Sequence, residues 1–219
     1  ARIDFATYTR LVKAGRLIEA ASSLSVLLKQ DTTLTEAQKL AINNNLGILY
    51  KKLGQYDIAL KYYDTAESIY NNNSFADNSF LVNIFSNRAN IYSVKGDLNK
   101  ALEYTEKAIR SVQGGNNASL FKQQSTSSLY LSAGIVYSQL NNFDLALSSF
   151  KKSILLKNKY NFPGKDIVYL NLARTYAKIG NNSLSDKYFN LSISQSEAEN
   201  GSFSVNLANI FLEYGNYLM

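Results

Sequence analysis

Apolar side chains recur along this chain at the spacing of amphipathic helices. In the segment 46–53, the residues at i, i+3, i+4 and i+7 are Leu46, Leu49, Tyr50 and Leu53. Gly54 follows, and glycine commonly ends a helix because it adopts left-handed backbone angles without strain. A second pattern with helical spacing then runs through Tyr56, Leu60, Tyr63 and Ala66. The segment 46–66 therefore predicts two helices joined by a tight turn.

The same two-helix pattern returns along the chain, which indicates an array of repeats. Its clearest marker is a small residue on the first helix of each pair, where the two helices would approach closely. The equivalent small residues, separated by 42, 45, 39 and 35 positions, are Gly47, Ala89, Gly134, Ala173 and Ala208. Upstream, Gly15 matches Gly54 at a separation of 39. The predicted repeats span about 1–34, 40–73, 82–115, 127–160 and 166–199, with a partial repeat at 201–219.

This pattern resembles the tetratricopeptide repeat, in which small, aromatic and glycine residues recur at fixed places. In the second repeat these places are filled by Gly47, Tyr50, Gly54, Ala59 and Tyr63. Departures from the family pattern occur at Thr105, Asn141 and Ser185, which replace an aromatic residue, a glycine and an alanine. The resemblance implies an all-α fold, a right-handed α-solenoid of stacked antiparallel helix hairpins that bury their apolar faces against one another.

We expect a single solenoid domain over residues 1–219. The last predicted helix lacks the second helix of its hairpin, and no polar capping helix precedes Met219. The chain is therefore expected to be a fragment of a longer protein.

The composition argues against catalysis. There is no histidine and no cysteine, which removes the commonest general base, the commonest metal ligand and every thiol nucleophile. The carboxylates are spread along the predicted second helices, as at Asp57, Asp64 and Glu103, rather than paired. We predict a protein that is not an enzyme and uses neither a cofactor nor a metal ion.

Charge and hydropathy bear on the kind of partner that the protein binds, but they do not decide its cellular compartment. The net charge of +6 comes from scattered lysines and arginines rather than from one basic run. No apolar segment approaches the roughly 18 residues that span a membrane, so we predict no membrane insertion. Cytoplasmic and periplasmic locations both stay open.

The resemblance also implies a binding surface, because tetratricopeptide arrays bind peptides along the concave face formed by their first helices. Asparagine occupies the same concave position in four repeats, as Asn45, Asn87, Asn171 and Asn206. The full set of predicted peptide-binding residues is Asn44, Asn45, Lys51, Asn87, Asn90, Leu131, Ile135, Asn171, Arg174, Lys178 and Asn206.

The repeated asparagines, which we call the asparagine ladder, have two possible roles. A carboxamide both donates and accepts, so repeated asparagines could bind the N–H and C=O groups of an extended peptide whatever its sequence. The same amides could instead bond to neighbouring helices, and Leu131 and Ile135 could anchor a partner or be buried by the next helix. No three consecutive repeats carry the carboxylate clamp of some family members, which argues against a receptor for chaperone tails.

We predict a non-enzymatic scaffold that binds a protein or an extended peptide. The alternative is a sensory or regulatory module of a larger bacterial signalling protein, such as a sensor kinase, a transcription regulator or a CHAT peptidase, because long-period arrays resemble those modules. The array would then contact a C-terminal domain beyond Met219. RNA binding by the basic, tyrosine-rich surface is a weaker alternative, and nucleic acid is not the expected partner.

Overall fold

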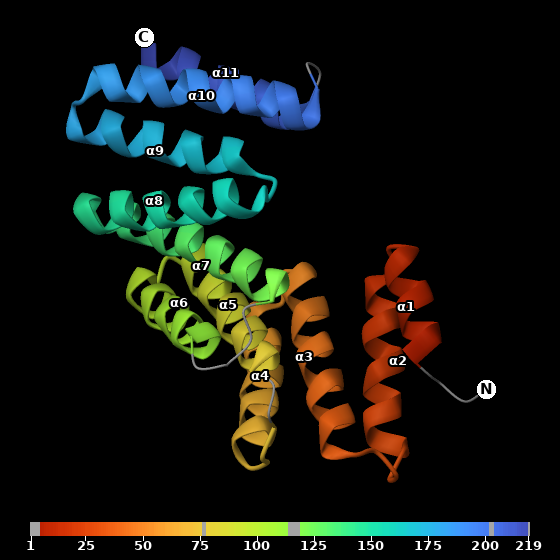
Figure 1. Ribbon diagram of the computed structural model, residues 1–219. Coiled ribbons are helices and arrows are strands. Elements are labelled where there is room, and N and C mark those ends of the chain that lie inside the picture. The colour runs from red at the N-terminus through yellow and green to blue at the C-terminus, as the bar shows by residue number, and fades with distance from the viewer. Residues whose placement is uncertain (1–4, 76–77, 114–118, 202–203, 219) are drawn as a thin grey trace. The chain divides into compact units, whose positions relative to one another are not determined.

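The computed structural model describes residues 5–75, 78–113, 119–201 and 204–218, which form eleven helices and no strand (Figure 1). The chain divides into two compact units, Ala1–Gly115 (unit 1) and Asn116–Met219 (unit 2). The helices of unit 1 are α1 (Phe5–Lys13), α2 (Leu17–Gln30), α3 (Glu36–Lys52), α4 (Tyr56–Asn71), α5 (Ser79–Val94) and α6 (Leu98–Gln113). Those of unit 2 are α7 (Leu120–Gln139), α8 (Phe143–Tyr160), α9 (Lys165–Ile179), α10 (Asn182–Asn200) and α11 (Val205–Leu218).

Consecutive helices pair as hairpins, as the sequence pattern predicts. The pairs are α1–α2, α3–α4, α5–α6, α7–α8 and α9–α10, and α11 packs against α10. Within unit 1 the first helices α3 and α5 also contact each other, as do α7 and α9 within unit 2. This arrangement confirms the predicted all-α array of stacked hairpins. That the chain is one solenoid domain, divided into five repeats and a partial repeat at the predicted positions, stays a prediction.

The hairpin turns depend on one residue with left-handed backbone angles. Gly54, between α3 and α4, has φ +74°, as the glycine of a helix terminus commonly does. In the α7–α8 turn the corresponding residue is Asn141, with φ +58°. Asparagine tolerates this region better than other side chains do. The departure from glycine at position 141 therefore keeps the same turn.

Stacked tyrosines hold three of the hairpins together. One ring comes from the first helix and the other from the second, at equivalent places in each repeat. The ring centroids lie 5.4, 5.5 and 5.4 Å apart, and the rings are within 6° of parallel, in the pairs Tyr50–Tyr62, Tyr92–Tyr104 and Tyr176–Tyr188. Such pairs contribute about 0.5–1.5 kcal/mol beyond their buried area.

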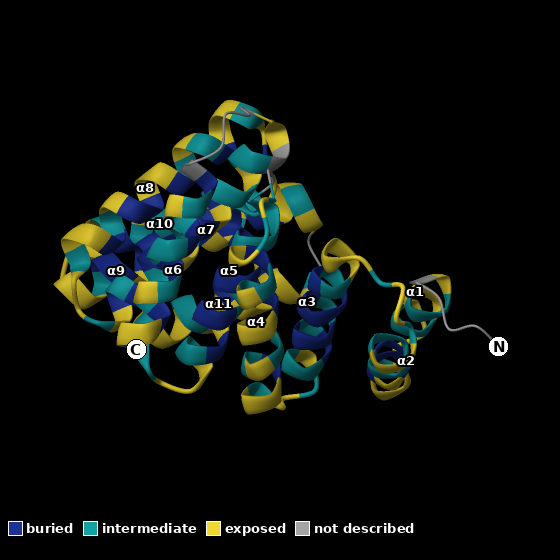
Figure 2. Cartoon of the chain, turned by 90° about the horizontal axis from the view of Figure 1, so that it is seen from below, coloured by how far each residue is buried: buried dark blue, intermediate teal, exposed yellow. Residues whose placement is uncertain are grey.

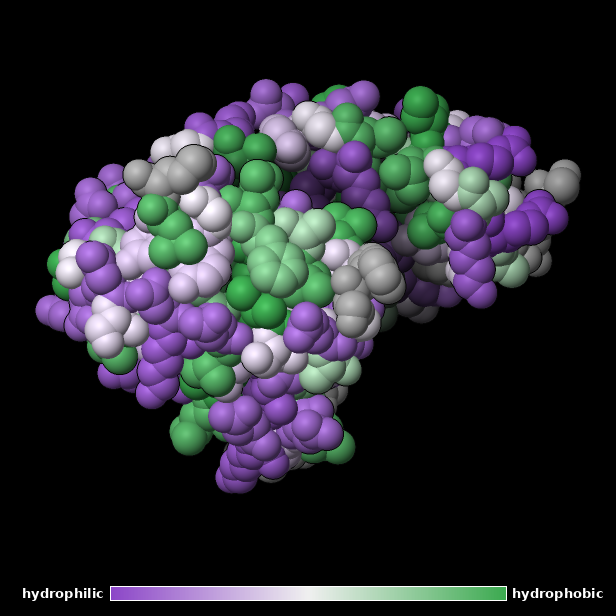
Figure 3. All heavy atoms as spheres, turned by 90° about the horizontal axis from the view of Figure 1, so that it is seen from above, coloured by the Kyte–Doolittle hydropathy of each residue, from purple (hydrophilic) through white to green (hydrophobic). Residues whose placement is uncertain are grey.

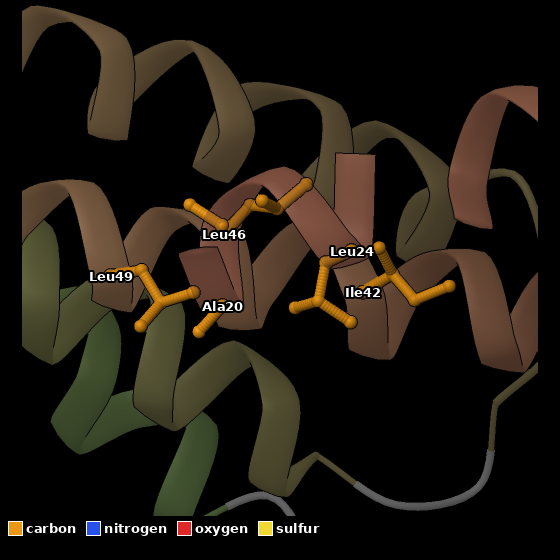
Figure 4. Packing of buried hydrophobic residues seen from close by; sticks show 6 residues of the cluster. Ala20, Leu24, Ile42, Leu46 and Leu49 are labelled. Carbon is orange, nitrogen blue, oxygen red and sulfur yellow. The ribbon is translucent and has the colours of Figure 1, made fainter. Parts of the chain in front are cut away.

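Buried side chains join neighbouring hairpins as well as the two helices of one hairpin (Figure 2). In unit 1, Ala20 and Leu24 of α2 point toward Ile42, Leu46 and Leu49 of α3 (Figure 4). In unit 2, a matching cluster joins α8 to α9. Each fully buried leucine or isoleucine is worth about 1.5–3 kcal/mol, which is why the hairpins stack.

Among the described residues, no helix is long and apolar enough to cross a bilayer.

Candidate peptide-binding face

The predicted binding residues of unit 1 lie on its first helices, α3 and α5, which contact each other (Figure 1). Asn45 and Lys51 belong to α3, and Asn87 and Asn90 belong to α5. Asn90 is exposed, whereas Asn45, Lys51 and Asn87 are half-buried. We refer to these four residues as the α3–α5 face.

Lys51 and Asn87 join the two helices directly. The Lys51 Nζ donates to the Asn87 Oδ1 over 2.5 Å. Burial of the ammonium, with the neighbouring Lys52 as a smaller cause, lowers the pKa of Lys51. The bond holds the Asn87 amide in one orientation, with its NH₂ group turned away from Lys51.

The other amides of the α3–α5 face are unbonded. Among the described residues, neither Asn45 nor Asn90 makes a side-chain hydrogen bond, and the Asn87 Nδ2 has no acceptor. Polar groups at a half-buried position are normally paired with protein or with water. Together the two helices therefore present unpaired donors and acceptors, which is what an extended peptide backbone requires.

Asn44 does not belong to this face. Its side chain is only 5% exposed, and its Oδ1 is buried without a hydrogen-bond partner. The amide faces the packed interior of unit 1, where a peptide does not reach it. The one-residue offset from Asn45 turns the side chain by about 100° around a helix, which is enough to bury it.

Three predicted residues of unit 2, all on α9, are bonded to other groups of the same unit. Asn171, 8% exposed, donates to the Ile167 carbonyl over 2.8 Å and accepts from Arg174 at 3.4 Å. Arg174 of α9 forms a two-pronged ion pair with Glu213 of α11. Lys178 Nζ lies 3.4 Å from the Ser138 carbonyl of α7. These contacts join α7, α9 and α11 and leave few free groups.

Three further residues complete the predicted set. Leu131 and Ile135 of α7 are half-buried and pack against the cluster that contains Phe150 and Val168. Asn206, at the start of α11, is exposed and makes no side-chain hydrogen bond among the described residues. The structure thus brings Lys51 and Asn87 together in unit 1, and places Leu131 and Ile135 partly in a core.

Sequence reasoning missed one polar network. Arg88 of α5, beside Asn87, is buried, and its guanidinium donates to Asp64 and Glu67 of α4 and to Tyr104 of α6. The guanidinium also lies 5.1 Å from the centroid of the Tyr104 ring. Its position directly before Ala89, on the packed side of the helix, was the signal that it is buried. Arg88 anchors the helix that carries Asn87 and Asn90.

Comparison with known proteins decides the family. One profile of the tetratricopeptide repeat matches residues 38–113, and a second matches residues 127–160 and 167–199. The chain belongs to the tetratricopeptide repeat family. Tetratricopeptide proteins are typically interaction scaffolds without catalytic activity, and the all-α structure described above is that of the family. No curated protein sequence matches this tetratricopeptide protein.

Several solved structures share the fold of this tetratricopeptide protein. BtubC (BKLC) from P. vanneervenii has a TM-score of 0.76 and 19% identity, covering 90% of this chain and 80% of that one. A tetratricopeptide repeat protein from Parabacteroides merdae ATCC 43184 has a TM-score of 0.67 and 22% identity over 96% of this chain and 72% of that one. MamA AMB-1 has a TM-score of 0.59 and 19% identity over 93% of both chains. At these identities the likeness shows the fold alone.

Among the described residues, no group of three or more histidine, cysteine or acidic side chains is placed to hold a metal ion.

Proposed function

We propose that this tetratricopeptide protein is a protein-interaction scaffold that binds an extended peptide segment on the α3–α5 face. The observation that carries the proposal is that, among the described residues, the amides of Asn45 and Asn90 and the NH₂ group of Asn87 make no hydrogen bond, on two helices that contact each other. Family membership supports a protein partner, and the amides support a backbone-directed mode of binding.

The geometry favours an extended peptide over a folded surface. Asn45 and Asn87 occupy equivalent places on successive first helices, so they repeat in the direction in which the hairpins stack. An extended chain offers its N–H and C=O groups at regular intervals, and each asparagine can satisfy one of each. A hydrogen bond between uncharged groups contributes about 1 kcal/mol net, so several are needed for useful affinity.

Lys51 adds a fixed positive charge to this site. Its ammonium is held against Asn87 and is partly removed from water, which is the reason its pKa is lowered. A carboxylate or carbonyl oxygen of a bound peptide would give the ammonium a further acceptor. We therefore infer that the bound segment places an acceptor oxygen, preferably an acidic side chain, near Lys51.

Unit 2 is not part of this proposed site. Asn171 is already hydrogen-bonded to the Ile167 carbonyl and to Arg174, and Arg174 is also paired with Glu213. We assign these residues to the packing of α9 against α11, and we assign peptide binding to Asn45, Asn87 and Asn90.

The test uses short peptides selected by display on the intact chain. The dissociation constant of an enriched peptide is then measured by calorimetry for the wild type and for the double variant Asn45→Ala/Asn87→Ala. The proposal predicts a loss of about 2 kcal/mol, roughly thirtyfold in Kd. The matched control is Asn99→Ala, an exposed asparagine on the second helix α6 of the same unit, which should bind as the wild type does. Equal affinities for all three proteins would remove the proposal.

The regulatory alternative differs in the identity of the partner. A sensory module of a larger bacterial signalling protein would use the same face for a segment of its own chain or of its target. The weaker RNA alternative predicts binding that falls steeply with salt, because phosphate contacts release counterions. Seven of the thirteen described basic side chains of unit 1 are paired with carboxylates, such as Lys95 with Asp57 and Lys107 with Glu103, which reduces the positive charge open to RNA on this unit.

A further inference from the structure

Unit 2 carries a second surface with a different chemistry, on the outward side of α8. From Leu145 to Lys165, both included, the sequence has five lysines and no acidic residue. The side of α8 opposite its buried residues carries Leu145, Ser148, Lys152, Leu155 and Lys159, all exposed. We call these five residues the α8 stripe. Asp144, directly before Leu145, is the nearest carboxylate along the helix.

The two leucines of the stripe project into solvent. Leu145 is 45% exposed and Leu155 is 67% exposed, although both lie on a helix whose other face is well buried. They are ten residues apart, which corresponds to about 15 Å along a helix. Single exposed leucines need no explanation, but two that alternate with lysines on one helical edge form a patterned surface.

The lysines of the stripe are held by aromatic rings rather than by carboxylates. The Lys152 Nζ lies 5.2 Å from the centroid of the Tyr130 ring on α7, and the Lys159 Nζ lies 5.2 Å from that of Tyr160. Neither lysine is in an ion pair within the described part of the chain. A ring orients an ammonium without cancelling its charge. Both positive charges therefore remain available to an anionic partner.

The second helices of unit 1 differ. The outward side of α4 carries Asp57 and Asp64, and that of α6 carries Glu103 and Glu106. On α6, Lys107 pairs with Glu103 and Arg110 pairs with Glu106. On α4, the exposed Lys61 stands four residues after Asp57 and three before Asp64. The uncompensated charge of the α8 stripe is thus not a general property of the repeat.

We propose that the α8 stripe docks an acidic amphipathic helix of a partner protein, which places two apolar residues against Leu145 and Leu155 and its carboxylates against Lys152 and Lys159. Charge complementarity selects an acidic partner, and the paired leucines select one with an apolar edge. Nucleic acid makes no use of two exposed leucines. A lipid surface calls for a broad apolar face, whereas only a single edge of α8 projects. This surface lies on a second helix, so it is independent of the α3–α5 face.

The test starts from a displayed library of helical peptides, with randomised charged and apolar positions, selected on the full chain. The inference predicts that enriched peptides carry aspartate or glutamate beside two apolar residues about three helical turns apart. Their Kd should rise at least about tenfold with Lys152→Glu/Lys159→Glu, and similarly with Leu155→Ser. Lys61→Glu on α4, an exposed lysine of another second helix, is the matched control and should leave Kd unchanged. Binding should also weaken as salt is raised.

Three results would overturn the inference. Enriched peptides could be neutral or basic, or they could bind the charge-reversed variant as tightly as the wild type. The lysine-dependent ligand could prove to be phosphatidylserine vesicles or single-stranded RNA, with no acidic helix selected. The double variant Asn45→Ala/Asn87→Ala leaves the α8 stripe intact. Its effect on peptide binding therefore tests the α3–α5 proposal separately from the α8 proposal.

Discussion

Gly134 of α7 lies directly against the ring of Phe150 of α8, so closely that a Cβ at position 134 would stand 2.6 Å from the Phe150 Cδ1. The equivalent pair in unit 1 is Gly47 and Tyr63, where the corresponding separation from the Tyr63 Cδ1 is 2.7 Å. Both rings are fully buried. Gly134 and Gly47 therefore set how closely the two helices approach in the α7–α8 and α3–α4 hairpins.

Gly134→Leu is expected to destabilise the protein by about 3 kcal/mol or more, because the added side chain forces the Phe150 ring or the helices apart. Gly215→Ala is the control, since a Cβ there meets nothing within 4 Å and alanine favours a helix by about 0.5–1 kcal/mol. Urea unfolding gives both values. Asn87→Ala should change stability little, and a loss as large as that of Gly134→Leu would mean that the repeat register is wrong.

Tyr63→Phe tests the buried hydroxyl in the same hairpin. The Tyr63 hydroxyl is buried without a hydrogen-bond partner, so its removal should be neutral or raise stability by about 1 kcal/mol at pH 7. Burial raises the pKa of Tyr63, with the nearby Arg88 charge opposing. Above about pH 10 the unfolded chain loses this proton while the folded protein keeps it, so stability falls by about 1.4 kcal/mol per pH unit from this group.

The pH dependence separates this mechanism from simple repacking. The advantage of Tyr63→Phe over the wild type should grow between pH 10 and pH 11 in thermal or urea unfolding. Other tyrosines with raised pKa, such as Tyr188, affect both proteins equally and cancel in the difference. A difference that stays constant from pH 7 to pH 11 would argue against the buried-hydroxyl account.

Lys157→Met tests the corner between α8 and α9. Lys157 is 7% exposed, and its Nζ donates to the Pro163 carbonyl over 2.5 Å. Burial lowers the pKa of Lys157, while Glu199 and Asp166 oppose that effect. Its loss should destabilise the protein by about 2 kcal/mol, because the carbonyl and two acidic groups lose their cation. Lys151→Met, on the exposed side of α8, should shift the urea midpoint little.

Much of the fold followed from the sequence, because it depends on local patterns. The helical spacing around Leu46 and Leu49 and the turn residue Gly54 are visible in any one repeat, and their recurrence identified the family. Asn141 shows that the turn geometry, rather than glycine itself, is what the position requires.

The candidate site was less predictable, because it depends on which polar groups find partners between helices. Asn44 and Asn45 are adjacent asparagines, yet the first is buried and the second is half-exposed without a bond. Arg174 and Asn90 hold equivalent positions in their repeats, but Arg174 is paired with Glu213 of the following first helix, α11. Such contacts join residues 36–40 positions apart, as for Lys51 and Asn87, and no local pattern encodes them.

The most direct test of the central claim uses the absence of cysteine from the chain. Asn90→Cys places one thiol on the α3–α5 face, and Asn99→Cys places one on the second helix α6 of the same unit. The maleimide labelling rate of each is measured with and without a display-selected peptide at saturation. The account predicts slower labelling at position 90 and no change at position 99. Unchanged labelling at position 90, or protection at position 99 alone, would contradict it.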